Sequence, residues 1–216
     1  MPKESKEKKI ERAKKIITRL KNNYPNAQCS LTYKTIHQLM VATILSAQCT
    51  DERVNKTTPE LFKKYKSIKA FAEADLKELA QDIFATGFHN SKAKSIKNSA
   101  IKLLEQYDGK IPQTLDELVK LPGVGRKTGS VVLGEGYKKA EGIVVDTHVG
   151  RICRLLKLTN QKDPVKVERD LMLIIPRQDW ILFTHLMIDH GRAICKARKP
   201  DCANCFLTDL CPSANI

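Results

Sequence analysis

The sequence predicts an all-α fold. In most segments the apolar residues recur three and four positions apart, which is the spacing of the buried face of a helix. Capping pairs that start helices precede two of these segments, at Asp75–Glu78 and Thr114–Glu117. The run Ile143-Val144-Val145 is too short to form a sheet alone, and no other segment alternates convincingly like a strand.

The pattern places helices over residues 3–21, 35–45, 51–65, 75–83, from about 92 to 108, 114–119, from 126, 147–158, from 163 and over 179–190. The first combines an apolar stripe with a solvated basic face. The second is apolar over most of its surface, so we expect it to be the buried central helix. The third is expected to be interrupted or restarted at Thr58-Pro59, and Asp51 is its expected N-cap.

Composition favours a polyanionic partner. The chain has 216 residues, of which 42% are hydrophobic, so it can bury a normal core. Lys and Arg number 38 against 24 Asp and Glu, a net charge of +14 that suits a phosphate backbone. No run approaches the roughly 18 apolar residues of a membrane span, and the first residues lack the apolar region of a signal peptide. We therefore expect a soluble cytoplasmic protein with no membrane contact.

The segment Leu121-Pro122-Gly123-Val124-Gly125 is predicted to be a hairpin between two helices. Pro122 and Gly123 end the helix that begins at Thr114, and Gly125 permits a second tight turn before Arg126 and Lys127 open the next helix. Gly123 and Gly125 lack side chains, so their N–H groups can approach an anion. A plain helix–turn–helix corner is the alternative, but the adjacent cations favour a phosphate clamp.

Glycines are unusually frequent after the hairpin. Gly129, Gly134 and Gly136 fall inside a predicted helix, where each costs about 1 kcal/mol relative to Ala. They indicate either close helix packing or a looser helix.

Four of the seven cysteines lie near the end of the chain. Cys195, Cys202, Cys205 and Cys211 form the pattern C-x6-C-x2-C-x5-C, whereas the other three are scattered among apolar neighbours as core thiols are. Four thiolates can hold a [4Fe–4S] cluster or a zinc ion. A zinc ribbon pairs two C-x2-C units, and only one such unit is present here.

These motifs together resemble one family. The run L-P-G-V-G-R-K-T, the following V-D-T-H and the cysteine spacing are similar to the helix–hairpin–helix DNA glycosylases, and within them to endonuclease III. The resemblance covers nearly the whole chain. It implies a two-lobed all-α fold, with a six-helix barrel over residues 30–140 and a discontinuous iron–sulfur cluster domain formed by residues 1–29 and 141–216. It also implies a [4Fe–4S] cluster rather than zinc.

The resemblance implies roles for individual residues. Lys127 would attack the sugar, assisted by Asp146, although taken alone Lys127 could bind phosphate and Asp146 could cap the helix that follows it. Phe88 stands where the family often has Leu wedged into the duplex, but it could equally be a core residue. Lys92 is expected to contact a phosphate. The full set of expected DNA contacts is Gln48, Phe88, Lys92, Gly123, Gly125, Arg126, His148, Lys196 and Arg198.

The implied activity is that of a bifunctional DNA glycosylase and abasic-site lyase. Lys127 favours this branch, because adenine- and mismatch-specific relatives generally lack a lysine there. The substrate would be duplex DNA with an oxidised pyrimidine or an abasic site, and the protein would act as a monomer. Three alternatives stay open: a monofunctional glycosylase of the same fold, a non-catalytic DNA-binding protein, and a zinc-binding structural module.

Overall fold

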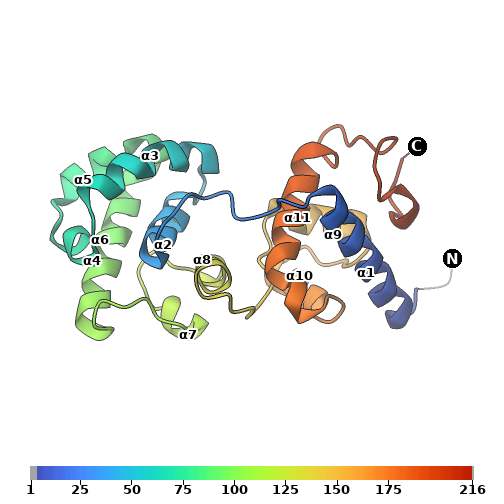
Figure 1. The fold of residues 1–216 in the computed structure, drawn as a ribbon, viewed down its shortest axis with the longest axis horizontal. Helices are drawn as coiled ribbons and strands as arrows, with labels where there is room; N and C mark the ends of the chain where they lie inside the picture. Colours follow the sequence, from blue (N-terminus) through green and yellow to red (C-terminus); the bar gives the residue numbers. More distant parts are fainter. Residues whose placement is uncertain (1–3, 216) are drawn as a thin grey trace. The chain divides into compact units, whose positions relative to one another are not determined.

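The computed structural model describes residues 4–215, and within that range every regular element is helical. Figure 1 shows these helices, and the predicted all-α fold is confirmed. Position 3, where the first predicted helix begins, lies outside the described residues. The chain divides into two compact units, one formed by Cys29–Glu141 and the other by the described residues on either side of it. No helix of the described range is long and apolar enough to cross a membrane.

The unit Cys29–Glu141 contains most of the helices. Its elements are α2 (Ile36–Leu45), α3 (Asp51–Lys64), α4 (Ile68–Glu73), α5 (Leu76–Asp82), the short helix η1 (Phe84–Thr86), α6 (His89–Gln106), α7 (Leu115–Leu118), α8 (Arg126–Val131) and the π-helical turn η2 (Val132–Gly136).

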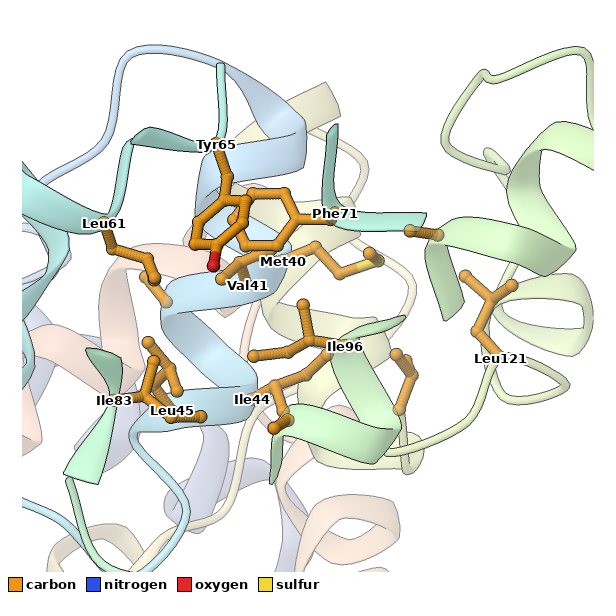
Figure 2. Close-up of a cluster of buried hydrophobic side chains, with 14 of the residues drawn as sticks. Met40, Val41, Ile44, Leu45, Leu61, Tyr65, Phe71, Ile83, Ile96 and Leu121 are labelled. Carbon is orange, nitrogen blue, oxygen red and sulfur yellow. The ribbon is translucent and has the colours of Figure 1, made fainter. Parts of the chain in front are cut away.

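Helix α2 is the centre of this unit, as its composition predicts. Every residue from Leu39 to Leu45 is buried, and α2 packs against α3, α6, α8 and η2. Figure 2 shows its side chains among those of the surrounding helices, with the rings of Tyr65 and Phe71 stacked 5.0 Å apart. Full burial of one such apolar side chain contributes about 1.5–3 kcal/mol. The core around α2 is therefore the main source of stability for the unit.

Two local predictions for α3 and its neighbours are wrong. The N-cap of α3 is Thr50, whose hydroxyl accepts from the Arg53 N–H at 3.3 Å, and not Asp51. The helix also continues through Pro59 without interruption. In addition, the short helix α4 was not predicted. Its N-cap Ser67 accepts from the Ala70 N–H, and Phe71 anchors it in the core.

The second unit brings both ends of the described chain together. It consists of α1 (Lys6–Asn23), α9 (Thr147–Leu155), α10 (Pro164–Met172), η3 (Arg177–Asp179), α11 (Trp180–Ala193) and η4 (Thr208–Leu210). Helices α1 and α9 both pack on α11. Arg12 of α1 donates to the Leu156 and Leu210 carbonyls, and Arg19 donates to the Phe206 carbonyl at 2.8 Å. The first helix therefore stabilises the cysteine-rich segment.

The hairpin between α7 and α8 is held tightly against α6. Leu121 and Val124 are buried, and the Pro122 carbonyl accepts from the Ser99 hydroxyl at 2.6 Å. Gly123 has φ +75°, and a Cβ there would lie 2.6 Å from the Cβ of Ser95. Both its backbone conformation and its close approach to α6 therefore require glycine.

The backbone conformation at position 125 does not require glycine. Its φ of −85° suits any residue, and a Cβ there would meet no atom within 4 Å. The expectation that Gly125 makes a second tight turn is wrong. Its missing side chain instead leaves the backbone open on the outer side of the hairpin.

The glycines after the hairpin are associated both with close helix packing and with a looser helix. A Cβ at Gly129 would lie 2.8 Å from Leu115, and one at Gly136 would lie 2.9 Å from Ile36, so both mark close packing. The segment Val132–Gly136 is also wound as a π-helix. Such turns occur mostly as single insertions in α-helices.

We expect Gly123→Ala to destabilise the protein and Gly125→Ala to leave its stability almost unchanged. At position 123 the left-handed backbone costs about 1–2 kcal/mol for Ala, and the clash with Ser95 adds about 1–3 kcal/mol. At position 125 neither cost applies, so the free energy of unfolding should change by no more than about 0.5 kcal/mol. Urea denaturation of the two variants measures this difference, and equal effects would contradict the assigned role of Gly123.

Candidate functional site

Lys127 lies in the first turn of α8, directly after the hairpin. Its side chain is exposed, and its ammonium group has no hydrogen-bond or ion-pair partner among the described residues. Within the same described range, no backbone carbonyl accepts a hydrogen bond from the N–H of Gly123 or of Gly125. Lys120 and Arg126 are also exposed beside them. The hairpin therefore offers an anion two open N–H donors and a lysine amine that is accessible to a reactant.

Asp146 is the N-cap of α9. Its Oδ1 accepts from the Val149 N–H at 2.8 Å, and its side chain is half-exposed. The capping role that its position suggests is therefore present, and a carboxylate can accept further hydrogen bonds while it caps. Lys127 belongs to the unit Cys29–Glu141 and Asp146 to the other unit. Their pairing remains a prediction from the resemblance.

Helix α11 fixes the segment that carries Asp146 and His148. The Thr184 hydroxyl donates to the Val144 carbonyl at 3.0 Å, just before Asp146. A Cβ at Gly191 would lie only 2.3 Å from the Nδ1 of His148, so this glycine makes room for the imidazole. The same Nδ1 is buried and has no hydrogen-bond partner in the described range. The half-exposed His148 is therefore packed closely, and its structural or DNA-facing role stays a prediction.

Gln48 and Phe88 project from two turns of the unit Cys29–Glu141. Both are exposed, and Phe88 has 64% of its surface accessible, so the alternative that it is a core residue is wrong. Both also have left-handed backbones, with φ of +53° and +49°. Such conformations are uncommon for residues other than glycine, and they concentrate at functional sites.

Lys92 is placed differently from the prediction. It is only 5% exposed, and its Nζ donates to the Leu45 carbonyl at 2.7 Å and to the Thr86 carbonyl at 2.8 Å. The helix begins at His89, which carries Lys92 into the interior. A phosphate contact for Lys92 is therefore wrong in this structure.

Phe84 is an exposed aromatic residue that the sequence did not reveal. It is 60% exposed, and its ring centroid lies 4.8 Å from that of His89. It lies in η1, in the same connection as Phe88. Apolar residues are usually buried, so the sequence carried no signal for its exposure.

The four cysteines near the C-terminal end surround one cavity. Cys195, Cys202, Cys205 and Cys211 line a space of about 80 Å³ together with apolar side chains such as Ile152 and Leu207. A single water molecule needs only about 10–15 Å³ by the same measure. No group of three or more His, Cys, Asp or Glu side chains in residues 4–215 is placed to hold a single metal ion. Four thiols around a larger space fit a polynuclear cluster.

Several donors point at these sulfur atoms. Arg151 Nη1 lies 3.7 Å from the Sγ of Cys195, and the Leu207 N–H donates to the Sγ of Cys205 at 3.4 Å. Burial raises the pKa of both thiols, and Arg151 opposes that shift at Cys195. Hydrogen bonds of this kind stabilise thiolates that bind a metal.

His190 is a further neighbour of the cysteines. It is 2% exposed, and burial, followed by the nearby Arg151, lowers its pKa to about 4. Its Nε2 lies 3.8 Å from the Sγ of Cys205, and its Nδ1 lies 3.2 Å from the Tyr24 hydroxyl. The neutral ring therefore links α1 to the cysteine loop. Lys196 and Arg198 are exposed on that loop.

Comparisons with known proteins agree with these features. Residues 41–177 match the family model of the HhH-GPD superfamily base excision DNA repair protein, and residues 195–211 match the iron-sulfur binding domain of endonuclease III. The endonuclease III of Synechocystis sp. is 52% identical over 206 residues, which are 95% of this chain and 94% of that relative.

Two solved structures share the fold. An endonuclease III in a non-covalent complex with DNA has a TM-score of 0.90 and 39% identity, covering 95% of this chain and 96% of its own. A trapped covalent intermediate between endonuclease III and DNA has a TM-score of 0.89, with the same identity and coverage. The predicted resemblance and the predicted [4Fe–4S] cofactor are confirmed. The chain belongs to the endonuclease III family, within the HhH-GPD superfamily of base excision DNA repair proteins.

Proposed function

We propose that the protein is a DNA N-glycosylase with abasic-site lyase activity that removes oxidised pyrimidines from duplex DNA. The observation that carries the proposal is the exposed Lys127 amine, which has no partner in the described range and directly follows two open backbone N–H groups. The relatives solved with DNA, one of them as a covalent intermediate, support it.

The chemistry assigned to Lys127 begins once the damaged nucleotide has left the base stack. The unprotonated Nζ attacks C1′ of the deoxyribose, and the bond from C1′ to the base breaks as the base leaves. The amine and the opened sugar then form a Schiff base. Loss of a proton from C2′ expels the 3′ phosphate by β-elimination, and hydrolysis of the Schiff base frees Lys127.

The carboxylate of Asp146 would support two parts of this sequence. As the base leaves, positive charge develops on the sugar, and a nearby carboxylate stabilises it. The same group can help to take a proton from the Lys127 ammonium, which leaves the free amine that attacks. Since Asp146 is fixed as the N-cap of α9, its carboxylate would need little reorganisation to act.

The remaining expected contacts would bind the DNA backbone and separate the bases. The N–H groups of Gly123 and Gly125 would bind one phosphate, and Arg126, Lys196 and Arg198 would contact others. Gln48 would enter the gap left by the flipped nucleotide, and Phe88 would stack between bases. His148 would face the DNA.

Cys195, Cys202, Cys205 and Cys211 would hold the [4Fe–4S] cluster. The cluster would supply a rigid support for the loop that carries Lys196 and Arg198, without taking part in the cleavage reaction. The whole protein would work as a monomer in the cytoplasm, on nucleoid DNA.

We expect the wild-type protein to release an oxidised pyrimidine from a duplex oligonucleotide and to cleave the strand 3′ to the lesion. Lys127→Ala should lose strand cleavage, because no amine remains to form the Schiff base. Lys69→Ala is the matched control, since Lys69 is an exposed lysine on α4 with a 72% exposed side chain. Gel electrophoresis of a panel of damaged duplexes, with separate detection of the freed base, measures both steps.

Other outcomes of that panel distinguish the alternatives. Base release without strand cleavage by the wild type would indicate a monofunctional mismatch or adenine glycosylase. Salt-dependent DNA binding without release of any base would leave only a non-catalytic clamp. In either case the lyase assignment would be wrong.

We expect the purified protein to contain about four iron and four sulfide ions per chain. Cys202→Ser should lose much of the iron and the visible absorbance, because one of the four ligands is removed. Cys29→Ser should keep both, since Cys29 lies in the other unit. Elemental analysis checks this: a colourless wild-type protein with one zinc ion would contradict the cluster, and an unchanged iron content in Cys202→Ser would contradict the ligand assignment.

A further inference from the structure

The buried ammonium group of Lys92 joins two segments that are far apart in the sequence. Its Nζ donates to the Leu45 carbonyl at 2.7 Å and to the Thr86 carbonyl at 2.8 Å. Leu45 is the last residue of α2, and Thr86 is the last residue of η1. One side chain therefore caps the carboxyl ends of two helices.

This position is chemically suited to a cation. The last carbonyl groups of a helix have no partner within it, and the helix end carries partial negative charge. The hydrogen bonds of the Lys92 ammonium satisfy one such carbonyl on each helix. Burial lowers the pKa of Lys92 from its ordinary value, with a smaller opposing effect from Cys49. Burying a charged ammonium costs free energy. We therefore expect Lys92 to have a role besides packing.

The two capped helices lead directly to Gln48 and Phe88. Gln48 follows Leu45 by three residues, and Phe88 follows Thr86 by two. Both turns have left-handed backbones at these residues, with φ of +53° and +49°. The backbone N–H of Lys92 also donates to the Phe88 carbonyl at 3.0 Å. The Lys92 side chain therefore bonds once to the chain before Phe88 and once to the chain before Gln48, and its backbone N–H makes the ordinary first-turn bond of α6 to Phe88.

We propose that Lys92 is a positioning residue that holds the Gln48 and Phe88 turns in one fixed relation, so that both side chains enter the duplex together. The inference rests on the proposed function, because it takes Gln48 and Phe88 to be inserted into DNA. Lys92 itself touches neither DNA nor the reacting atoms. It acts by preventing the two strained turns from moving independently when the bases are separated.

Helix α6 also carries an ordinary structural lysine, which serves as a matched control for Lys92. Lys97 also lies on α6, is partly buried, and donates from Nζ to a carbonyl, that of Ala74, at 2.6 Å. Ala74 ends α4 and leads to α5. Lys97→Met thus removes a comparable hydrogen bond to a helix end without touching the Gln48 or Phe88 turn.

The test uses the full-length protein and a duplex with a non-cleavable abasic-site analogue opposite 2-aminopurine, whose fluorescence rises when it is unstacked. The variants are Lys92→Met, Lys97→Met, Gln48→Ala and Phe88→Ala, with thermal unfolding measured for each. We expect Lys92→Met to lose most of the fluorescence rise and to bind the duplex roughly 5- to 160-fold more weakly, the range for a lost stacking contact. Lys97→Met should keep the rise and bind within about twofold of the wild type, even if it lowers thermal stability.

A second comparison tests coupling between the residues. If Lys92 acts through Phe88, the double variant Lys92→Met/Phe88→Ala should lose little more affinity than Lys92→Met alone. If Lys92→Met does not fold, Lys92→Gln takes its place, because its amide keeps N–H donors without the charge. Additive losses in the double variant would overturn the proposal.

The remaining outcomes separate this inference from the proposed function. If Gln48→Ala and Phe88→Ala both leave the fluorescence rise unchanged, insertion of these side chains is wrong and the positioning role is overturned with it. If those two variants abolish the rise but Lys92→Met behaves like Lys97→Met, insertion stands and only the role of Lys92 is overturned.

Discussion

The close contact between the hairpin and α6 determines the geometry of the hairpin and of the helix that carries Lys127. Gly123 can lie against Ser95 only because it has no side chain, and the Ser99 hydroxyl holds the Pro122 carbonyl at 2.6 Å. These contacts use the Pro122 carbonyl and the Cα of Gly123, and within the described residues the N–H groups of Gly123 and Gly125 stay without a backbone acceptor. They also set the point at which α8 begins, and with it the position of Lys127. Packing inside the unit thus determines what the surface can bind.

Packing inside the unit also supports the turns that carry Gln48 and Phe88. The core around α2 buries a continuous set of apolar side chains, which stabilises the unit well beyond what any one turn costs. Two left-handed residues can therefore persist at its surface, each at a cost of about 1–3 kcal/mol. Lys92 satisfies the helix ends beneath them. In the other unit, α11 plays a comparable part by holding the segment that leads to Asp146.

The sequence predicted the structure correctly where a signal was local or repeated. The capping pair at Thr114, the apolar surface of α2 and the spacing of the four cysteines each follow from neighbouring residues. It failed where three-dimensional packing decides. The burial of Lys92 and the exposure of Phe84 depend on which face of a helix meets the core, and α4 is too short to show a clear period. Of the two reasons predicted for Gly125, only the tight turn is wrong, and its φ of −85° was needed to show this.

The proposed reaction requires that the amine of Lys127 becomes covalently joined to the deoxyribose. Borohydride reduction during the reaction with a lesion-containing duplex, followed by proteolysis and mass spectrometry of the cross-linked peptide, tests it most directly. We expect a stable protein–DNA adduct with the added mass on Lys127, and none with Lys127→Ala. An adduct of undiminished yield in Lys127→Ala, or one mapped to a different amine in the wild-type protein, would contradict it.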